Sequence, residues 1–428
     1  HILYVTDLTG LLEIGRWSKS DSNVAQALKP HIASGEVIMV GEVSPDRLVV
    51  GERLGPDFIN LFRRIDVPAM SEEESLAVLG NVARDLEQQY DVRIEPNATE
   101  AATQLARRFL PYRAFPGKSI RLLEEAVADR IRDDREDAQT DPSSAFRGSV
   151  LRRVYRKQLV KRRHILDSFS RHSGMPEFVI NDRSRLDLDS VEQYFLERVH
   201  GQNHAVAGMV NLIATVKAGL NDPNQPLGTF LFIGPTGVGK THMAKSLASY
   251  LFGDEDRLIR FDMSEYSDVD GVARLIGAFD KEGELTKQVR AQPFSVVLLD
   301  EFEKASPRIY DIFLQVLGEG RLTDSTGRTT FFHNTIVILT SNLGSSASNF
   351  GGFGFGKDTS VSNEEVNAAL VEHYRNQIER YFRPEFVNRL DQIIVFGQLH
   401  PDALREIASR ELRQILNRDG ITRRNLLV

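Results

Sequence analysis

A glycine-rich segment, GPTGVGKT, lies between a strand-like apolar run and a helical run and constrains this chain more than any other feature. The pattern GxxxxGK[ST] in that position predicts a loop whose backbone N–H groups curl around a polyphosphate at a helix N-terminus. Lys240 is predicted to reach the terminal phosphates, and the Thr241 hydroxyl to ligate Mg²⁺. The remaining residues predicted to cradle the nucleotide are Gly234, Pro235, Thr236, Gly237, Val238 and Gly239.

Short apolar runs rich in Val, Ile and Phe alternate with helical patterns on both sides of this loop. Continuously apolar strands separated by helices are typical of a parallel sheet that is covered on both faces. We therefore predict an α/β fold with a parallel sheet flanked by helices. The expected strands are 229–234, 258–263, 296–301 and 335–342, and the clearest helices are 204–219 and 241–252.

Length and composition narrow the class of protein. A chain of 428 residues can form several domains, and 53 Lys and Arg against 60 Asp and Glu give an ordinary net charge of −7. The absence of Cys excludes disulfides, Cys-ligated metals and thiol catalysis. No apolar run approaches the roughly 18 residues that a membrane span needs, and no secretory h-region is present. We expect a cytoplasmic protein, and we expect residues upstream of His1 because the chain opens inside a strand-like run.

The polar side chains that follow two of the expected strands complete a nucleotide site. Asp300 and Glu301 end the run VVLLDE, where Asp300 could orient the hydration shell of magnesium and Glu301 could polarise an attacking water. Asn342 follows the next strand, where its amide could position that water or sense the γ-phosphate. Arg389, which has no obvious acidic partner in its own segment, could neutralise transition-state charge in a neighbouring subunit. Adjacent acids or an arginine could instead be solvated surface groups.

Several motifs occur in an order that resembles the second ATPase module of the Clp branch of AAA+ proteins, the heat-shock disaggregases and unfoldases. They are GPTGVGKT, RFDMSEY, RLIGA, VVLLDEFEKA, GEGRLTDSTGRT, TSNLG and FRPEFVNRLD. The resemblance implies AAA+ P-loop modules with small all-α subdomains. It also implies ATP and Mg²⁺ as cofactors, protein substrates, and a self-assembled hexameric ring or helical assembly. ATP would bind at subunit interfaces, with Arg389 reaching the neighbouring site and with Val199 and His200 contacting the adenine.

The same resemblance suggests how the chain is divided. Residues 1–70 would be the later part of a first large subdomain, and 71–145 its small helical subdomain. The helix expected at 71–90 opens with a Ser71/Glu74 capping box. The polar stretch 133–148 is expected to be a linker or loop, and residues 146–185 a basic helical linker. Residues 186–396 would form the active second large subdomain, and 397–428 the start of a truncated small subdomain.

Two departures from the family pattern concern activity. Where the family has an Asp-Glu pair in the first module, this chain has Thr6 and Asp7, or Asp7 and Leu8 if the register shifts by one. The family's arginine fingers fall on Asn60 and Leu61. The first module is therefore expected to be catalytically degenerate. In the second module the segment that follows RLIGA is shorter than the family's pore loop, and Phe279 is the aromatic residue left nearby. Either the loop is deleted or residues are missing from the sequence at this point, and a deletion would put the threading of a polypeptide in question.

Two further segments suggest partners. Phe353-Gly354-Phe355 is a near match to the loop that docks protease-associated relatives on a peptidase ring, although a Gly-rich surface loop is an alternative. Seven Arg and Lys residues lie within 152–163, which could contact nucleic acid. A solvated helix face is the preferred interpretation, because few aromatics are interleaved. Trp17 is expected to be a packing residue. The His residues show no metal-ligand spacing.

These observations predict an ATP-driven Clp-like motor whose second module binds and hydrolyses MgATP. A nucleotide-gated scaffold or regulator that threads no polypeptide is the main alternative. A nucleic-acid-remodelling ATPase is a third hypothesis.

Overall fold

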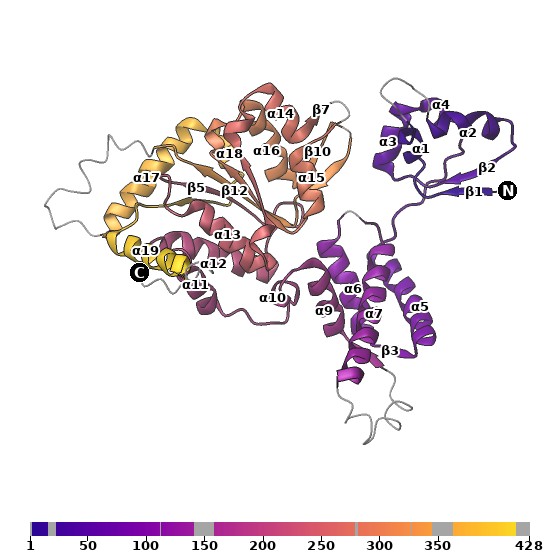
Figure 1. Ribbon diagram of the computed structural model, residues 1–428, viewed down its shortest axis with the longest axis horizontal. Helices are drawn as coiled ribbons and strands as arrows, with labels where there is room; N and C mark the ends of the chain where they lie inside the picture. The colour runs from indigo at the N-terminus through magenta and orange to yellow at the C-terminus, as the bar shows by residue number, and fades with distance from the viewer. Residues whose placement is uncertain are drawn as a thin grey trace, which may run out of the picture.

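The computed structural model of the protein describes residues 2–15, 23–111, 113–140, 158–278, 281–325, 327–344 and 363–416. Figure 1 shows three units that follow one another along the chain. We call residues 2–62 the N-terminal unit, residues 71–180 the helical unit and residues 186–396 the sheet unit. The predicted residues Trp17, Phe279 and Phe353-Gly354-Phe355 lie outside the described residues.

The sheet unit contains a five-stranded sheet in which all strand pairs are parallel, in the order β13-β5-β12-β9-β6. This confirms the predicted α/β fold. The strands are β5 (Gly228–Ile233), β6 (Leu258–Asp262), β9 (Ser295–Asp300), β12 (Thr335–Ser341) and β13 (Gln392–Val395). The helices are α11 (Leu188–Leu196), α12 (Asn203–Ala218), α13 (Lys240–Phe252), α14 (Val269–Ile276), α15 (Glu284–Ala291), α16 (Pro307–Glu319), α17 (Asn363–Tyr381) and α18 (Pro384–Val387).

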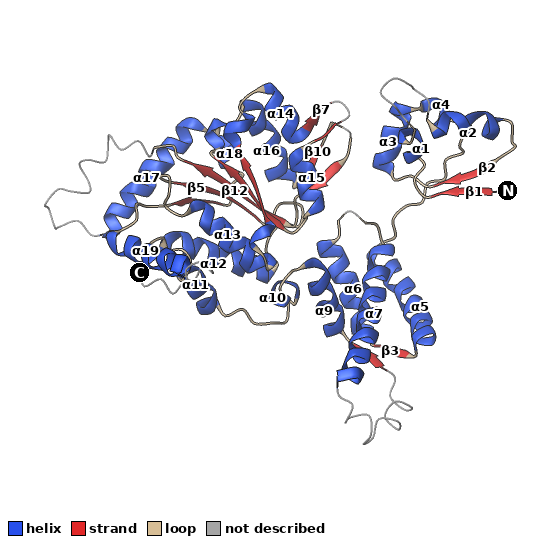
Figure 2. Cartoon of the chain, in the orientation of Figure 1, coloured by secondary structure: helices blue, strands red, loops and turns tan. Residues whose placement is uncertain are grey.

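Shorter elements join this framework, and α19 (Pro401–Leu416) follows it. Two short antiparallel pairings join β7 (Gly277–Ala278) to β8 (Lys281–Glu282), and β10 (Arg321–Thr323) to β11 (Thr329–Phe331). The 3-10 turns are η1 (Glu255–Arg257), η2 (Met263–Tyr266) and η3 (Phe302–Lys304). Figure 2 shows the strands of the sheet lying between helices on both sides.

The sheet buries both faces, which explains why its strands are apolar without alternation. Along β5, Phe230 and Phe232 belong to one core cluster, whereas Leu231 and Ile233 belong to another. The first cluster includes side chains of α12 and α13, and the second includes side chains of α14, α16 and α18. Because every strand of the sheet is parallel, the polar residues that follow β5, β9 and β12 emerge at one edge.

The helical unit packs helices against a two-stranded parallel sheet. Its elements are α5 (Glu72–Tyr90), β3 (Val92–Ile94), α6 (Pro96–Phe109), α7 (Gly117–Thr140), β4 (Gln158–Val160), α9 (Arg162–Ser173) and α10 (Glu177–Ile180). The predicted capping box is present, because Ser71 accepts a hydrogen bond from the backbone N–H of Glu74 and the Glu74 carboxylate accepts one from Ser71. The polar residues 133–140 continue α7 and do not form the expected loop.

Among the described residues, the expected basic helical linker is helical only in part. Residues 158–160 form β4, which pairs in parallel with β3, and Val160 is fully buried. The helix begins only at Arg162, and it packs against α6 and α7 as part of the helical unit. Lys161 and Arg162 contact Glu95 and Gln104 of the same unit. The backbone of 158–160 thus obtains its hydrogen bonds from β3, a distant segment that local helical periodicity cannot reveal.

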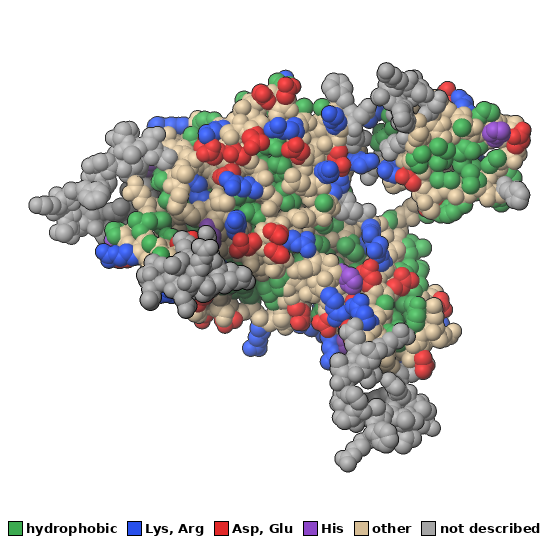
Figure 3. All heavy atoms as spheres, in the orientation of Figure 1, with side chains coloured by type: hydrophobic (Ala, Val, Ile, Leu, Met, Phe, Trp, Pro, Cys, Tyr) green, Lys and Arg blue, Asp and Glu red, His purple; other side chains and the backbone are tan. Residues whose placement is uncertain are grey.

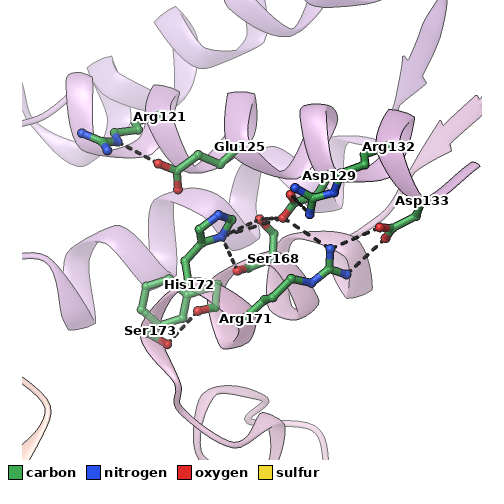
Figure 4. A network of polar contacts seen from close by, with 10 residues as sticks. Arg121, Glu125, Asp129, Arg132, Asp133, Ser168, Arg171, His172 and Ser173 are labelled. Atoms are coloured by element: carbon green, nitrogen blue, oxygen red, sulfur yellow. Dashed lines mark hydrogen bonds and ion pairs between the residues drawn. The ribbon is translucent and has the colours of Figure 1, made fainter. Parts of the chain in front are cut away.

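A buried polar network joins α7 to α9 and shows why this second helix belongs to the unit (Figure 4). Ser168, which is almost fully buried, donates a 2.8 Å hydrogen bond to Asp129, and Arg132 donates a 2.7 Å hydrogen bond to the other Asp129 oxygen. Arg171 makes two hydrogen bonds to Asp133, of 3.2 and 3.1 Å. The buried Asp129 carboxylate is therefore satisfied by partners from both helices, as a buried charge requires.

The helical unit and the sheet unit share one hydrophobic core. Phe109 of α6 lies 5.5 Å from Phe169 of α9 and 5.9 Å from Phe294, which precedes β9, between ring centroids. Beside this aromatic cluster, the buried side chain of Asn334 donates a 3.2 Å hydrogen bond to the carbonyl oxygen of Phe109. The two units are thus joined by buried contacts that resemble the interior of a single domain.

We expect Phe109→Ala to lower the free energy of unfolding by about 3–5 kcal/mol, because it leaves a cavity where two units meet. Chemical denaturation followed by far-ultraviolet circular dichroism would measure this change in the free energy of unfolding. Leu220→Ala is the matched control, since Leu220 is 78% exposed and its truncation should have little effect. A cost for Phe109→Ala as small as that of the control would contradict the shared core.

The N-terminal unit has a small core of its own, built around Leu8, Leu12, Ala25 and Phe58. Its elements are β1 (Ile2–Val5), α1 (Gly10–Glu13), α2 (Val24–Ala33), β2 (Ile38–Gly41), α3 (Pro45–Leu54) and α4 (Pro56–Ile59). β1 and β2 are parallel, and the side chains exposed on them include Ile2, Tyr4, Ile38 and Val40. Figure 3 shows hydrophobic side chains gathered on the surface of this unit.

Within the described part of the chain, none of the helices combines the length and the apolarity needed to cross a lipid bilayer.

Candidate nucleotide site

The glycine-rich loop runs from the end of β5 at Ile233 to the start of α13 at Lys240. Gly234, Gly237 and Gly239 all have positive φ angles, of 151°, 83° and 105°. A side chain at Gly234 would also collide with the carbonyl oxygen of Phe396. In the part of the chain that the structure describes, no side chain caps the N-terminus of α13, so its first N–H groups remain available to an anion. The loop therefore has the backbone geometry of an anion cradle.

Lys240 is buried at the first position of α13, with 7% of its surface exposed. Its ammonium donates to the carbonyl oxygens of Gly234 and Pro235, at 2.5 and 3.0 Å, and to Oδ1 of Asn342, at 2.6 Å. Burial lowers the pKa of Lys240 to about 8, although the nearby carboxylates, that of Asp300 above all, act in the opposite direction. The ammonium holds the loop curled and lies inside the cradle.

The depressed pKa of Lys240 predicts how nucleotide affinity depends on pH. As the pH rises through about 8, the free protein loses this proton, and a neutral amine no longer attracts phosphate. We expect ATP affinity to be steady below that pH and to fall above it, by up to tenfold per pH unit. Binding above pH 8 should also take up a proton, which calorimetry in buffers of different ionisation enthalpy would detect. Flat affinity between pH 7 and 9.5 would contradict this assignment.

The acidic pair lies at the end of β9, next to the loop. Asp300 accepts a hydrogen bond from the Thr340 hydroxyl, and its second oxygen accepts a 2.6 Å bond from Arg260. Glu301 has a left-handed backbone with φ of 54°, an uncommon conformation for a residue with a side chain. Its backbone N–H donates to the Thr340 hydroxyl at 3.0 Å, so one threonine of the neighbouring strand fixes both acids.

Asn342 connects the loop to the acidic pair. It follows directly after β12, which lies between β5 and β9 in the sheet. Its Oδ1 accepts from Lys240, and its Nδ2 donates to Oε1 of Glu301 at 3.2 Å. Lys304 donates to the other Glu301 oxygen at 2.5 Å. Three residues chosen from separate sequence motifs thus form one continuous chain of hydrogen bonds: Lys240, Asn342 and Glu301.

The oxygen donors at this edge suit magnesium. Thr241 is half-buried in the first turn of α13, and α13 packs against β9, which ends at Asp300. Mg²⁺ prefers oxygen ligands and commonly takes one or two protein groups together with phosphates and waters. One hydroxyl and one carboxylate meet that requirement. Among the described residues, no group of three or more His, Cys, Asp or Glu side chains is arranged to hold a metal by itself.

The residues predicted to contact adenine lie at the other side of the loop. Val199 is 3% exposed and lies close to Gly239 of the loop. His200 lies 3.1 Å from Glu406 of α19, between Nδ1 and Oε2. His200 and Glu406 also line a cavity with Glu197 and Arg410, which lies between the end of α11 and α19. The residues expected to surround a base are therefore placed between the loop and α19.

Gln202 is a member of this site that motif analysis missed. Its buried side chain donates to the carbonyl oxygens of Val238 and Gly397, at 3.2 and 2.9 Å, and accepts from the N–H of Gly397 at 3.1 Å. It thereby links the glycine-rich loop to the segment that leads from β13 to α19. A glutamine at the start of an apolar helix was the sequence signal, but its partners are distant in the chain.

Arg389 lies over α16 of its own chain. Its guanidinium donates to the carbonyl oxygen of Leu314 and packs so closely on Gly318 that a side chain there would collide with it. Arg389 is exposed, and its role in a neighbouring subunit stays a prediction.

Two parts of this chain match models of known protein families. Residues 225–393 match the family described as AAA domain (Cdc48 subfamily), and residues 71–147 match the AAA lid domain. A structure of Hsp104 with ATPγS and FITC casein is 31% identical, with a TM-score of 0.70 over 97% of this chain and 67% of that chain. The chain belongs to the Clp-type AAA+ ATPase family.

Other members of the family are similar over the same extent. The ATP-dependent Clp protease ATP-binding subunit ClpC of Staphylococcus aureus is 32% identical over all of this chain and 57% of its own length. The Staphylococcus epidermidis ClpC matches equally well. The Saccharomyces cerevisiae Hsp104–ADP complex has a TM-score of 0.69, with 30% identity, over 97% of this chain and 67% of that chain. The chain thus spans a little over half the length of these ClpC relatives.

Proposed function

We propose that this AAA+ protein is an ATP-driven, Clp-like motor that remodels other proteins, and that its sheet unit binds and hydrolyses MgATP. The observation that carries the proposal is the hydrogen-bonded chain from Lys240 through Asn342 to Glu301, beside an uncapped helix N-terminus. In this proposal it joins the group that binds the phosphates to the general base, and both must act on the same terminal phosphate during hydrolysis.

Each residue has a role that follows from its position. The loop N–H groups and Lys240 would bind the phosphates, and Thr241 and Asp300 would hold Mg²⁺, which neutralises phosphate charge when bound. Glu301, whose carboxylate faces Asn342, would accept a proton from the attacking water. Asn342 would keep that carboxylate directed at the terminal phosphate, because its amide also contacts Lys240. Val199 and His200 would contact the base.

The contacts of Asp7 in the N-terminal unit support the proposal that the first module is catalytically degenerate. Asp7, which follows β1, accepts hydrogen bonds from the Thr9 hydroxyl and the Gly10 N–H, at 2.8 and 3.1 Å, and pairs with Arg47. These partners hold the pKa of Asp7 below its ordinary value in spite of some burial, which acts the other way. Its carboxylate thus stabilises the start of α1, and neither neighbour in the chain is a second acid. This module would serve assembly or regulation.

The partners in the proposal are protein substrates and other copies of the chain in a ring or helical assembly. The solved Hsp104 complexes with casein support protein substrates, and the name of the ClpC relatives links them to a protease. Docking on a peptidase ring through Phe353-Gly354-Phe355, hexameric assembly with Arg389 in trans, and a cytoplasmic location all remain predictions.

Phosphate release with and without unfolded casein tests the proposed function. We expect casein to stimulate ATP hydrolysis, and we expect Lys240→Ala to abolish both the basal and the stimulated rates. Turnover that no polypeptide alters would favour the nucleotide-gated scaffold. Stimulation by DNA or RNA in place of casein would favour the nucleic-acid-remodelling alternative.

A further inference from the structure

A third acid, Glu303, lies two residues beyond Glu301 in η3 and contacts the site through a backbone group. Its Oε1 accepts a 3.0 Å hydrogen bond from the backbone N–H of Asn342. β12 ends at Ser341, whose partner on β5 is Ile233, the last residue of that strand. The N–H of Asn342 therefore lies just beyond the sheet ladder, and a carboxylate takes the place of a strand partner.

This contact fixes the residue whose side chain joins the two halves of the site. Asn342 must direct its amide oxygen to Lys240 and its amide nitrogen to Glu301 at the same time. Rotation of its backbone would move both contacts together. A carboxylate acceptor forms a strong hydrogen bond with a backbone N–H, stronger than a neutral acceptor does. Glu303 is thus placed to hold the Asn342 backbone in the orientation that both side-chain contacts need.

Aromatic residues contact the backbone of Glu303 and pack beside it. The hydroxyl groups of Tyr381 and Tyr310 donate to its carbonyl oxygen, at 2.5 and 3.3 Å. The preceding residue, Phe302, is fully buried and stacks on Phe386 with 5.4 Å between ring centroids. η3 is therefore anchored in the core beneath the sheet edge. Glu303 acts as a fixed support for Asn342, because its own backbone has little freedom to move.

In the part of the chain that the structure describes, the carboxylate of Glu303 makes one hydrogen bond, which is the one to Asn342. Its second oxygen, Oε2, is buried and has no hydrogen-bond partner among the described residues. A buried carboxylate oxygen without a partner costs free energy, so a purely structural role would be served better by a smaller neutral group. The same carboxylate is one of those that favour the charged form of Lys240. The unpartnered oxygen is thus retained beside the groups that bind and hydrolyse nucleotide.

We propose that Glu303 is a positioning residue for ATP hydrolysis, which holds the backbone of Asn342 so that its amide links Lys240 to Glu301. This inference rests on the proposed function, because it assumes that Glu301 is the general base. It predicts that Glu303 affects the chemical step and has little effect on nucleotide affinity measured well below pH 8, where Lys240 keeps its proton without this carboxylate.

The test compares Glu303→Ala with Glu303→Gln in the full chain. We expect Ala to lower kcat by roughly 10- to 100-fold, the range that misplaced catalytic groups produce, with the dissociation constant of fluorescent ADP almost unchanged. Gln should restore most of kcat, because its amide oxygen can accept the Asn342 N–H. Glu319→Ala is the matched control, since Glu319 is an exposed acid paired with Arg321. Thermal unfolding of each variant would show that all are folded.

A wild-type kcat in Glu303→Ala would overturn the inference, as would a Gln variant as slow as the Ala variant. A loss confined to nucleotide affinity would also overturn it. Glu301→Gln, assayed in parallel, separates this outcome from failure of the proposed function. If Glu301→Gln is inactive and Glu303→Ala is normal, only the positioning role fails. If Glu301→Gln retains full turnover, the assignment of the general base fails first.

Discussion

Glu301→Gln is expected to stop ATP turnover while ATP binding persists. The amide keeps the size of the side chain and can still accept from Nδ2 of Asn342, but it cannot accept the proton of the attacking water. General-base catalysis contributes about 10²–10⁴-fold, so kcat should fall by at least roughly 100-fold. Steady-state phosphate release measures kcat, and fluorescent ATP measures binding.

Glu385→Gln is the control for this change, because Glu385 is an exposed glutamate of α18. It should have wild-type kcat. Undiminished hydrolysis in Glu301→Gln would remove Glu301 from the mechanism.

Lys240→Ala is expected to weaken nucleotide binding itself by about 100-fold or more, since charge-assisted bonds to phosphate are lost. The two contacts that hold the loop curled and the contact to Asn342 are lost as well. The folded protein should survive this change, because it removes a buried cation whose pKa is already depressed. Displacement of fluorescent ADP would measure the affinity, and thermal unfolding would report the stability.

Lys245→Ala provides the matched control on the same helix, since Lys245 is exposed. It should bind nucleotide as the wild type does. Equal affinity in Lys240→Ala and Lys245→Ala would show that the loop does not bind phosphate in the proposed way.

Local sequence was sufficient to predict the sheet and the loop. The apolar runs and the glycine-rich motif depend on residues that are close in the chain, and the structure places Lys240, Glu301 and Asn342 together as parallel strand ends require. Their chemical roles remain proposals. The helix of residues 71–90 was likewise indicated by its own capping box.

Contacts between distant segments could not be predicted in this way. Gln202 forms a hydrogen bond with Gly397, which lies near the opposite end of the sheet unit in the sequence. Glu303 forms one with the backbone of Asn342. Neither contact leaves a periodic or composition signal, because each depends on how the strands are ordered. The error at residues 158–160 has the same origin, since pairing with β3 overrides the helical pattern expected from the local sequence.

The identity of the nucleotide held after incubation with MgATP tests the account most directly. Wild-type protein and Glu301→Gln would each be loaded, separated from free nucleotide and extracted for chromatography. We expect the wild type to hold mainly ADP, and the variant to hold ATP that stays intact. A wild-type protein that retains no adenine nucleotide, or a variant that converts ATP to ADP as fast as the wild type, would contradict the central claim.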